Sequence, residues 1–229
     1  MGQVFANDTA PWKPLRILGL PLAREGIPHI LATTLLTIVL GLFFGTLGTL
    51  FGLLLLAGVV NFFRDPERTP PDDPTAVVAP ADGKVIQVAD IEDQRFLRAP
   101  ATRVSIFMSP LDVHVNRIPW GGRVVDVHYN PGKFFRAFAD KASLDNEQTA
   151  VHVVDTDGHE LWFVQIAGFI ARRIVCRVEP GDEVVRGQRY GMILFGSRAD
   201  LYFPAGTAEI TVRAGDRTRA GETVVAQWR

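Results

Sequence analysis

Apolar residues are concentrated in one unbroken stretch near the N-terminus. From Ile30 to Phe63 the chain carries no charged residue. A membrane-spanning helix takes about 20 apolar residues at about 1.5 Å each, so this run is too long for one untilted helix. Gly41, Gly45, Gly48 and Gly52 lie in its middle, where they would bend the chain back or let two helices approach closely. The pattern predicts an apolar helical hairpin and leaves open whether it spans or re-enters a bilayer.

Basic residues flank the run on both sides: Lys13, Arg16 and Arg24 before it, and Arg64 and Arg68 after it. Because Lys and Arg are enriched on cytoplasmic flanks, both ends of the hairpin are expected on the cytoplasmic side. Residues 1–63 are therefore interpreted as a membrane-anchoring segment, which predicts a protein of the cell (cytoplasmic) membrane with the domain that follows the anchor on the cytoplasmic side. A cleaved signal peptide and a buried helix of a soluble domain are the alternatives.

The pattern changes twice after the hairpin. Residues 64–75 are rich in proline and charge and lack apolar residues to bury, so they are expected to form a linker. Residues 76–229 then show short apolar runs, rich in β-branched and aromatic residues and separated by turns. These runs predict strands of a mainly β domain, a sandwich or barrel, and make the whole chain α+β. A weak helical pattern covers Ile166 to Arg173.

Two segments of this domain share the spacing Gly-Asp-x4-Gly, namely Gly181 to Gly187 and Gly215 to Gly221. Both are expected to be turns between strands. Biotinyl and lipoyl carrier domains use similar turns, so the repeat indicates a fold more than a function.

Composition narrows the function classes. With 24 basic and 25 acidic residues the net charge is −1, which gives no basic field for nucleic acid. The single cysteine, Cys176, excludes an internal disulfide and a cysteine zinc cluster, and on a strand it would share a buried face with Ile174 and Val178. No two histidines have metal-ligand spacing, so no metal site is expected.

Three segments of the β domain combine polar side chains with apolar strands. Asp82 precedes a glycine, where a turn aspartate is the simpler interpretation. Asp112, His114 and Asn116 alternate, so on a strand they would face the same way, either toward a site or toward solvent. A loop with Lys133 and Asn146 would line a polar pocket or be solvated. Asn116, Lys133 and Asn146 are the candidates for substrate contacts.

Several motifs occur together in a family-specific order. They are Ala-Pro-Ala-Asp-Gly-Lys (79–84), Met-Ser-Pro-Leu-Asp-Val-His-Val-Asn-Arg (108–117), Tyr-Asn-Pro-Gly-Lys-Phe (129–134), Asn-Glu (146–147), Val-Gln-Ile-Ala-Gly (164–168), Ala-Arg-Arg-Ile-Val-Cys (171–176) and Phe-Gly-Ser-Arg (195–198). In this order the chain resembles the phosphatidylserine decarboxylases over about two thirds of its length. The short length, the apolar hairpin and the Phe-Gly-Ser-Arg form resemble the short prokaryotic branch.

The resemblance implies a precursor that cuts itself between Gly196 and Ser197. The products would be a larger β chain, residues 1–196, and a smaller α chain, residues 197–229, which stay together as a heterodimer. Ser197 would become a pyruvoyl group, so pyruvate is the implied cofactor. Glycine before the serine suits the strained backbone that the acyl shift needs.

The hydroxyl of Ser197 needs a base, for which His114 is the best candidate, with Asp82 orienting or charge-stabilising the imidazole. Long members of the family carry a second histidine three positions after the first, where this chain has Arg117. The base for self-cleavage therefore stays open between His114 and another group.

In turnover, the resemblance implies a Schiff base between the pyruvoyl group and the serine amine of phosphatidylserine in the membrane, followed by loss of carbon dioxide to give phosphatidylethanolamine. Two alternatives remain open from the sequence. One is a membrane-tethered adaptor of lipoyl-like fold without catalysis, and the other is a decarboxylase of a different serine phospholipid. The sequence also leaves open whether copies of the chain form a homo-oligomer.

Overall fold

The computed structural model describes residues 14–17, 19–132, 146–168, 173–194 and 197–229. The chain divides into two compact units. One is Trp12–Glu67 and the other contains Arg68–Arg229.

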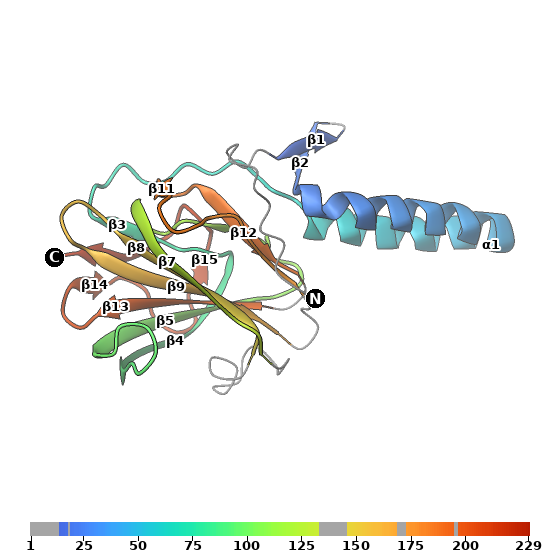
Figure 1. The fold of residues 1–229 in the computed structure, drawn as a ribbon. Helices are drawn as coiled ribbons and strands as arrows, with labels where there is room; N and C mark the ends of the chain where they lie inside the picture. The colour runs from blue at the N-terminus through green and yellow to red at the C-terminus, as the bar shows by residue number, and fades with distance from the viewer. Residues whose placement is uncertain (1–13, 18, 133–145, 169–172, 195–196) are drawn as a thin grey trace. The chain divides into compact units, whose positions relative to one another are not determined.

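The first unit is a helical hairpin with a short β-ribbon at its base. Strands β1 (Leu15–Ile17) and β2 (Leu20–Leu22) pair antiparallel, and a 3-10 turn, η1 (Arg24–Gly26), leads into helix α1 (Ile27–Phe62). The helix is broken at Gly45, whose φ of 60° and ψ of −142° are not helical. Figure 1 shows the chain running out along one arm of α1 and back along the other. The predicted apolar helical hairpin is confirmed.

The two arms of α1 meet through residues that lack a side chain. A Cβ at Gly52 would lie 2.7 Å from Thr37 Cα of the other arm, and one at Gly41 would lie 2.6 Å from Thr49 Oγ1. Each arm has about 17 residues and is roughly 26 Å long. Their outer surfaces expose Leu, Ile, Val and Phe side chains, and by length and composition α1 could cross a membrane.

The second unit is built on an antiparallel eight-stranded sheet that curls into a half-barrel (Figure 1). Its order is β11 (Glu183–Val184), β7 (Gly122–Asn130), β8 (Gln148–Val154), β9 (Glu160–Ala167), β13 (Ser197–Pro204), β5 (Pro100–Met108), β4 (Gly83–Glu92) and β15 (Arg217–Thr218). Two three-stranded sheets accompany it. One is β10 (Ile174–Cys176), β12 (Arg189–Ile193) and β6 (Val115–Arg117), and the other is β14 (Ala208–Ile210), β16 (Val224–Trp228) and β3 (Ala76–Val78).

The main core lies on one face of the large sheet. Because side chains alternate along a strand, Ile106 of β5, Phe163 of β9 and Leu201 of β13 reach the same core, and each is fully buried. Cys176 is buried with Ile174 and Val178 as predicted, and burial raises the pKa of its thiol to about 11. The predicted mainly β, α+β architecture is confirmed.

The prediction of a weak helix from Ile166 to Arg173 is wrong for its first two residues. Ile166 and Ala167 belong to β9, where they pair with Arg198 and Ser197 of β13, because cross-strand hydrogen bonds on both sides outweigh a weak local helical pattern. Residues 169–172 lie outside the described residues.

The two Gly-Asp-x4-Gly segments are turns, as predicted, and they occupy equivalent places at opposite edges of the sheet. Gly181 and Gly215 have φ of 101° and 105°, which glycine adopts without a steric penalty. Gly181 N–H donates to Val124 O and Gly215 N–H donates to Val85 O, both at 2.8 Å. The first turn leads into β11 and the second into β15.

The proline-rich stretch expected as a linker is divided between the two units at Glu67 and Arg68. From Arg68 onward it is bound to the β unit. Arg186 donates from Nη1 to the carbonyls of Asp73 and Ala76, and from Nη2 to that of Pro71 at 2.9 Å. These bonds fix the path that leads into β3.

Candidate functional site

Ser197 is the first residue of β13, a strand in the middle of the large sheet. It lies opposite Met108 of β5 on one side and Ala167 of β9 on the other. Its side chain is fully buried, and its Oγ donates to Met108 Sδ at 3.1 Å. Ser197 therefore presents its hydroxyl to the inner, core-lined face of the sheet.

His114 lies immediately before β6, beside the strand that leads toward Ser197. Its carbonyl accepts the N–H of Ile193 at 3.4 Å, and Ile193 ends β12. The imidazole is fully buried, and Nδ1 lies 3.0 Å from the carbonyl oxygen of Asp112. Because a carbonyl can only accept, Nδ1 carries the proton and Nε2 is the basic nitrogen of the neutral ring.

Asn116 of β6 forms a hydrogen bond to β9, the strand that pairs with β13 beside Ser197. Its Oδ1 accepts from Gln165 Nε2 at 2.9 Å, and its Nδ2 faces Met108 Sδ at 3.8 Å. Met108 thus contacts both Ser197 and Asn116. The structure brings this predicted substrate residue close to the serine.

Asp82 sits in the turn that enters β4, beside the end of β5. Its Oδ2 pairs with Arg68 Nη2 at 2.9 Å, and its Oδ1 accepts the N–H of Ala220 at 2.7 Å. Gly83 has no room for a side chain because Phe107 O lies against it, which keeps this turn close to Met108. Asp82 is therefore at the same end of the sheet as Ser197, with its carboxylate joined to Arg68.

Asn146 is buried next to β9, and its Nδ2 donates to the carbonyl of Ala167 at 2.6 Å. Ala167 is the direct strand partner of Ser197, so Asn146 is linked to the serine through Ala167 alone. The neighbouring Glu147 accepts from Tyr129 Oη at 3.0 Å, and burial together with this bond raises the pKa of Tyr129. Lys133 and Gly196 lie outside the described residues.

Asp112 does not share a strand face with His114 and Asn116, so that expectation is wrong. Strand β6 begins only at Val115. Asp112 closes a turn in which its N–H donates to Ser109 O at 2.9 Å and its carboxylate accepts the Ser109 N–H at 2.8 Å. Pro110 occupies the second position of this turn, where its fixed φ is favourable.

The sequence analysis missed a buried ion pair directly after Ser197. Arg198 and Asp200 are both fully buried, with Nε–Oδ1 at 2.6 Å and Nη2–Oδ2 at 2.9 Å. Arg198 Nη2 also donates to Ser105 Oγ at 2.7 Å. The alternation of Arg198 and Asp200 on a strand was visible in the sequence, but nothing local indicated that both would be buried.

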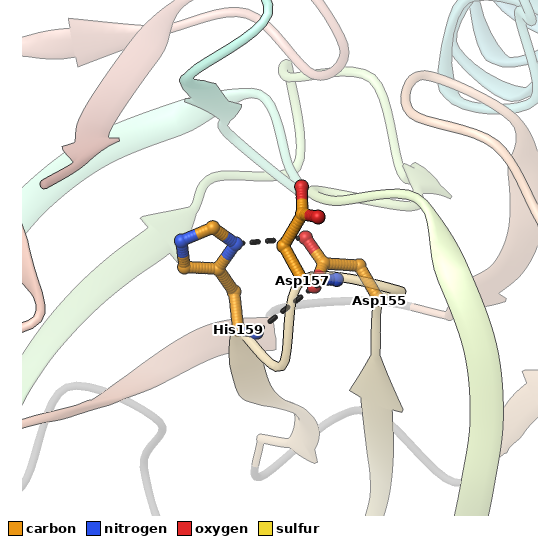
Figure 2. Close-up of side chains that lie close together, drawn as sticks. All are labelled: Asp155, Asp157 and His159. Atoms are coloured by element: carbon orange, nitrogen blue, oxygen red, sulfur yellow. Dashed lines mark hydrogen bonds and ion pairs between the residues drawn. The ribbon is translucent and has the colours of Figure 1, made fainter.

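A second group of titratable residues, Asp155, Asp157 and His159, lies in the turn between β8 and β9 (Figure 2). Asp155 accepts the N–H groups of Asp157 and His159, His159 Nδ1 and Trp120 Nε1, at 2.9 to 3.0 Å. Although burial acts in the opposite direction, these bonds lower the pKa of Asp155. His159 also stacks on Trp228, with ring centroids 4.9 Å apart. This arrangement stabilises a turn.

Comparison with known proteins supports an assignment for the whole chain. The family model described as phosphatidylserine decarboxylase matches residues 55–226. A phosphatidylserine decarboxylase proenzyme of Desulfotalea psychrophila is 45% identical over 207 residues, which cover 90% of this chain and 96% of that protein.

Two further proteins of the same name agree. The proenzyme of Geobacter metallireducens is 46% identical over 90% of this chain and 95% of its own length. That of Oleidesulfovibrio alaskensis is 49% identical over 88% of this chain and 92% of its own length. The chain belongs to the phosphatidylserine decarboxylase family, among its short bacterial members.

Proposed function

We propose that this chain decarboxylates phosphatidylserine to phosphatidylethanolamine in phospholipid biosynthesis, with a pyruvoyl group made from its own Ser197. The observation that carries the proposal is the complete burial of Ser197 at the head of a central strand. Burial shields the Ser197 hydroxyl from bulk water, so a reaction within the chain, on the peptide bond that precedes it, meets little competition from solvent. The relatives' name, proenzyme, agrees with a precursor.

Self-cleavage starts when the Ser197 hydroxyl attacks the carbonyl carbon of Gly196. The C–N bond breaks, an ester forms, and the nitrogen of Ser197 becomes a free amine. Elimination then releases residues 1–196 with a terminal carboxylate and leaves dehydroalanine at position 197. Addition of water and loss of ammonia leave a ketone, so all atoms are accounted for.

His114 is the proposed base for these proton transfers. The carbonyl of Asp112 fixes the tautomer in which Nε2 can accept a proton. The full burial of the ring keeps water from competing for this nitrogen. Asp82, held by Arg68 and the Ala220 N–H, supplies negative charge at the same end of the sheet.

The residues around position 197 fit a pyruvoyl group. Such a group keeps the Cβ, Cα and carbonyl carbons of the serine, carries an oxygen on Cα in place of the serine nitrogen, and loses Oγ, so it needs no more space than the serine. Met108 and Ala167 on either side offer an apolar wall, and the ladder of β13 holds the chain from Arg198 onward. When bound covalently there, a pyruvoyl group supplies an electron sink for decarboxylation.

The apolar hairpin gives a physical reason for a membrane location. Its exposed Leu and Phe side chains would be stabilised by lipid, and the substrate's acyl chains stay in the bilayer while its headgroup is processed. Arg16 and Arg24 before the helix and Arg64 after it favour the cytoplasmic side. We assign the protein to the cytoplasmic membrane, with the β unit on its cytoplasmic side.

The mass of the purified protein tests the proposal. We expect the unaltered chain to yield two fragments, residues 1–196 and a small fragment that begins with a pyruvoyl group at position 197. Ser197→Ala should remain full-length and inactive, whereas Ser109→Ala, a serine in a surface turn, should process normally. An unaltered chain that stays full-length would contradict the proposal and favour a non-catalytic adaptor. Vesicles with diacyl or ether-linked serine phospholipid would separate the two lipid substrates.

A further inference from the structure

Two fully buried polar atoms on the face of the sheet that carries Ser197 have no hydrogen-bond partner in the described part of the chain. They are Gln165 Oε1 of β9 and Thr149 Oγ1 of β8. Buried polar atoms are nearly always satisfied, because leaving one without a partner costs free energy. An unsatisfied pair on the same sheet face as a reactive residue points to a site for a ligand.

The orientation of the Gln165 amide is fixed by its neighbours. Its Nε2 donates to Asn116 Oδ1 at 2.9 Å and to the carbonyl of Val175 at 3.2 Å. Both partners are acceptors, so exchanging the amide O and N would place oxygen against oxygen. Gly191 makes room for this amide, since a Cβ there would lie 2.7 Å from Nε2. Gln165 Oε1 is therefore the amide atom that can still accept a hydrogen bond.

Strand register places both atoms on the face that carries Ser197. Thr149 and Gln165 are direct partners across β8 and β9. Gln165 is also the partner of Ala199, two residues along the same face from Ser197. It is thus a diagonal neighbour of Ser197, and such neighbours are about 7–8 Å apart, within reach of a long side chain.

The chemistry of the two atoms selects the ligand. Gln165 Oε1 only accepts hydrogen bonds, and the Thr149 hydroxyl can accept one as well. Of the ionic groups in a serine phospholipid headgroup, the carboxylate and phosphate only accept, and the ammonium group alone donates. Resting on the proposed function, we propose that Gln165 and Thr149 bind the amino group of the serine headgroup and hold it beside residue 197. Asn116 acts as a positioning residue that orients Gln165.

The test measures amine capture separately from carbonyl reactivity. The processed protein is mixed with phosphatidylcholine vesicles containing phosphatidylserine and with sodium cyanoborohydride, which fixes the amine covalently to residue 197. The mass of the small fragment is followed over time. A parallel reaction with hydroxylamine, a small neutral reagent, reports whether the ketone is present and accessible.

We expect Thr149→Val and Gln165→Met each to slow capture of the lipid amine about tenfold, the effect of losing roughly one hydrogen bond to a charged group. Their hydroxylamine rates should stay within about twofold of the unaltered chain, which is less than the loss of one such bond would cause. Thr149→Ser, which keeps the hydroxyl, should restore capture, and Thr211→Val at an exposed threonine should have no effect.

Unchanged capture in both variants would overturn the subsite and assign the two atoms to a structural water. An equal loss of capture and hydroxylamine reaction, or a loss of self-cleavage, would overturn it too, since the pair would then serve folding or cleavage. If the unaltered chain neither cleaves itself nor reacts with hydroxylamine, the proposed function fails instead.

Discussion

Arg198 and Asp200 form an ion pair that is excluded from water on a central strand, directly after the residue that would become the cofactor. Such a pair adds little net stability, because removing two charges from water offsets their attraction. It does favour one register, since Arg198 also reaches Ser105 on the neighbouring strand. We infer that the pair keeps β13 in register when the peptide bond before Ser197 is cut.

Removing one charge of the pair should lower the free energy of unfolding far more than replacing both charged residues together. Asp200→Ala leaves the Arg198 charge buried, and we expect it to lower the free energy of unfolding by about 3–5 kcal/mol. The double variant Arg198→Met/Asp200→Leu removes both charges and should be within about 1–2 kcal/mol of the original chain. Denaturant unfolding measures both. Equal losses in the two variants would argue against a charge-burial effect.

His152 lies on the other face of the large sheet and should make the free energy of unfolding depend on pH. Its ring stacks on Trp162 with centroids 4.5 Å apart, and burial lowers its pKa from the usual 6.5, although Glu160 and Asp126 act in the opposite direction. The unfolded chain therefore binds the proton more readily than the folded one. The stability due to the neutral ring is present above pH 6.5 and is lost as the pH falls toward the lower pKa.

We expect His152→Phe, which keeps an aromatic ring against Trp162, to flatten the pH dependence of unfolding below about pH 6.5. Denaturant midpoints at pH 5, 6 and 7.5 for both chains would measure this. His128→Phe, at a histidine that stacks on no aromatic ring among the described residues, is the matched control. A His152→Phe chain that loses stability with acid as steeply as the original would contradict the assignment.

At the scale of elements, the hairpin depends on close approach of its two arms. Gly52→Val would force a side chain into Thr37, whereas a side chain at Gly58 meets no atom within 4 Å. We expect Gly52→Val to lower the thermal midpoint of the helical circular dichroism signal in detergent, and Gly58→Val to change it much less. Equal effects would mean that helix propensity, and not arm packing, determines the stability of the hairpin.

The elements themselves could be predicted from the sequence because their signals are local. An uncharged run with central glycines is enough for the hairpin, and short β-branched runs between turns are enough for β5, β7 and β9. The weak helical pattern at Ile166 failed because pairing with β13 is a long-range interaction that no local window contains.

The side-chain partners at the site could not be predicted for the same reason. His114 and Ser197 were found from motifs, but the contact of Arg68 with Asp82 and that of Gln165 with Asn116 depend on how distant strands align. Asp112 was assigned to a strand because its alternation with His114 resembled one, although Pro110 had already signalled a turn.

At the scale of the whole molecule, the two proposed fragments are interwoven. Residues 197–229 supply β13 between β5 and β9, β15 next to β4, and β14 and β16 in the sheet with β3. Releasing the small fragment would break the ladders on both sides of a central strand and expose Leu201 and Phe203 of the main core. The fragments are therefore expected to stay together after cleavage.

We predict that the cleaved protein migrates as one species in size-exclusion chromatography under native conditions and separates into two only in strong denaturant. Native mass spectrometry should give the summed mass of both fragments, and denaturing mass spectrometry should give each one alone. Spontaneous loss of the small fragment on dilution would contradict the central role of β13. The Ser197→Ala chain, which cannot make the fragments, provides the reference elution volume.

The large sheet ends on both sides in strands of only two residues, β11 and β15, each entered through a Gly-Asp turn. Long, flat sheet edges invite pairing with other chains, and proteins avoid this with short edges that carry charge. Glu183 and Arg217 place an exposed charge on each edge. The duplicated turn thus does more than complete the fold, because it gives the strand-rich β unit short, charged edges that disfavour edge-to-edge aggregation.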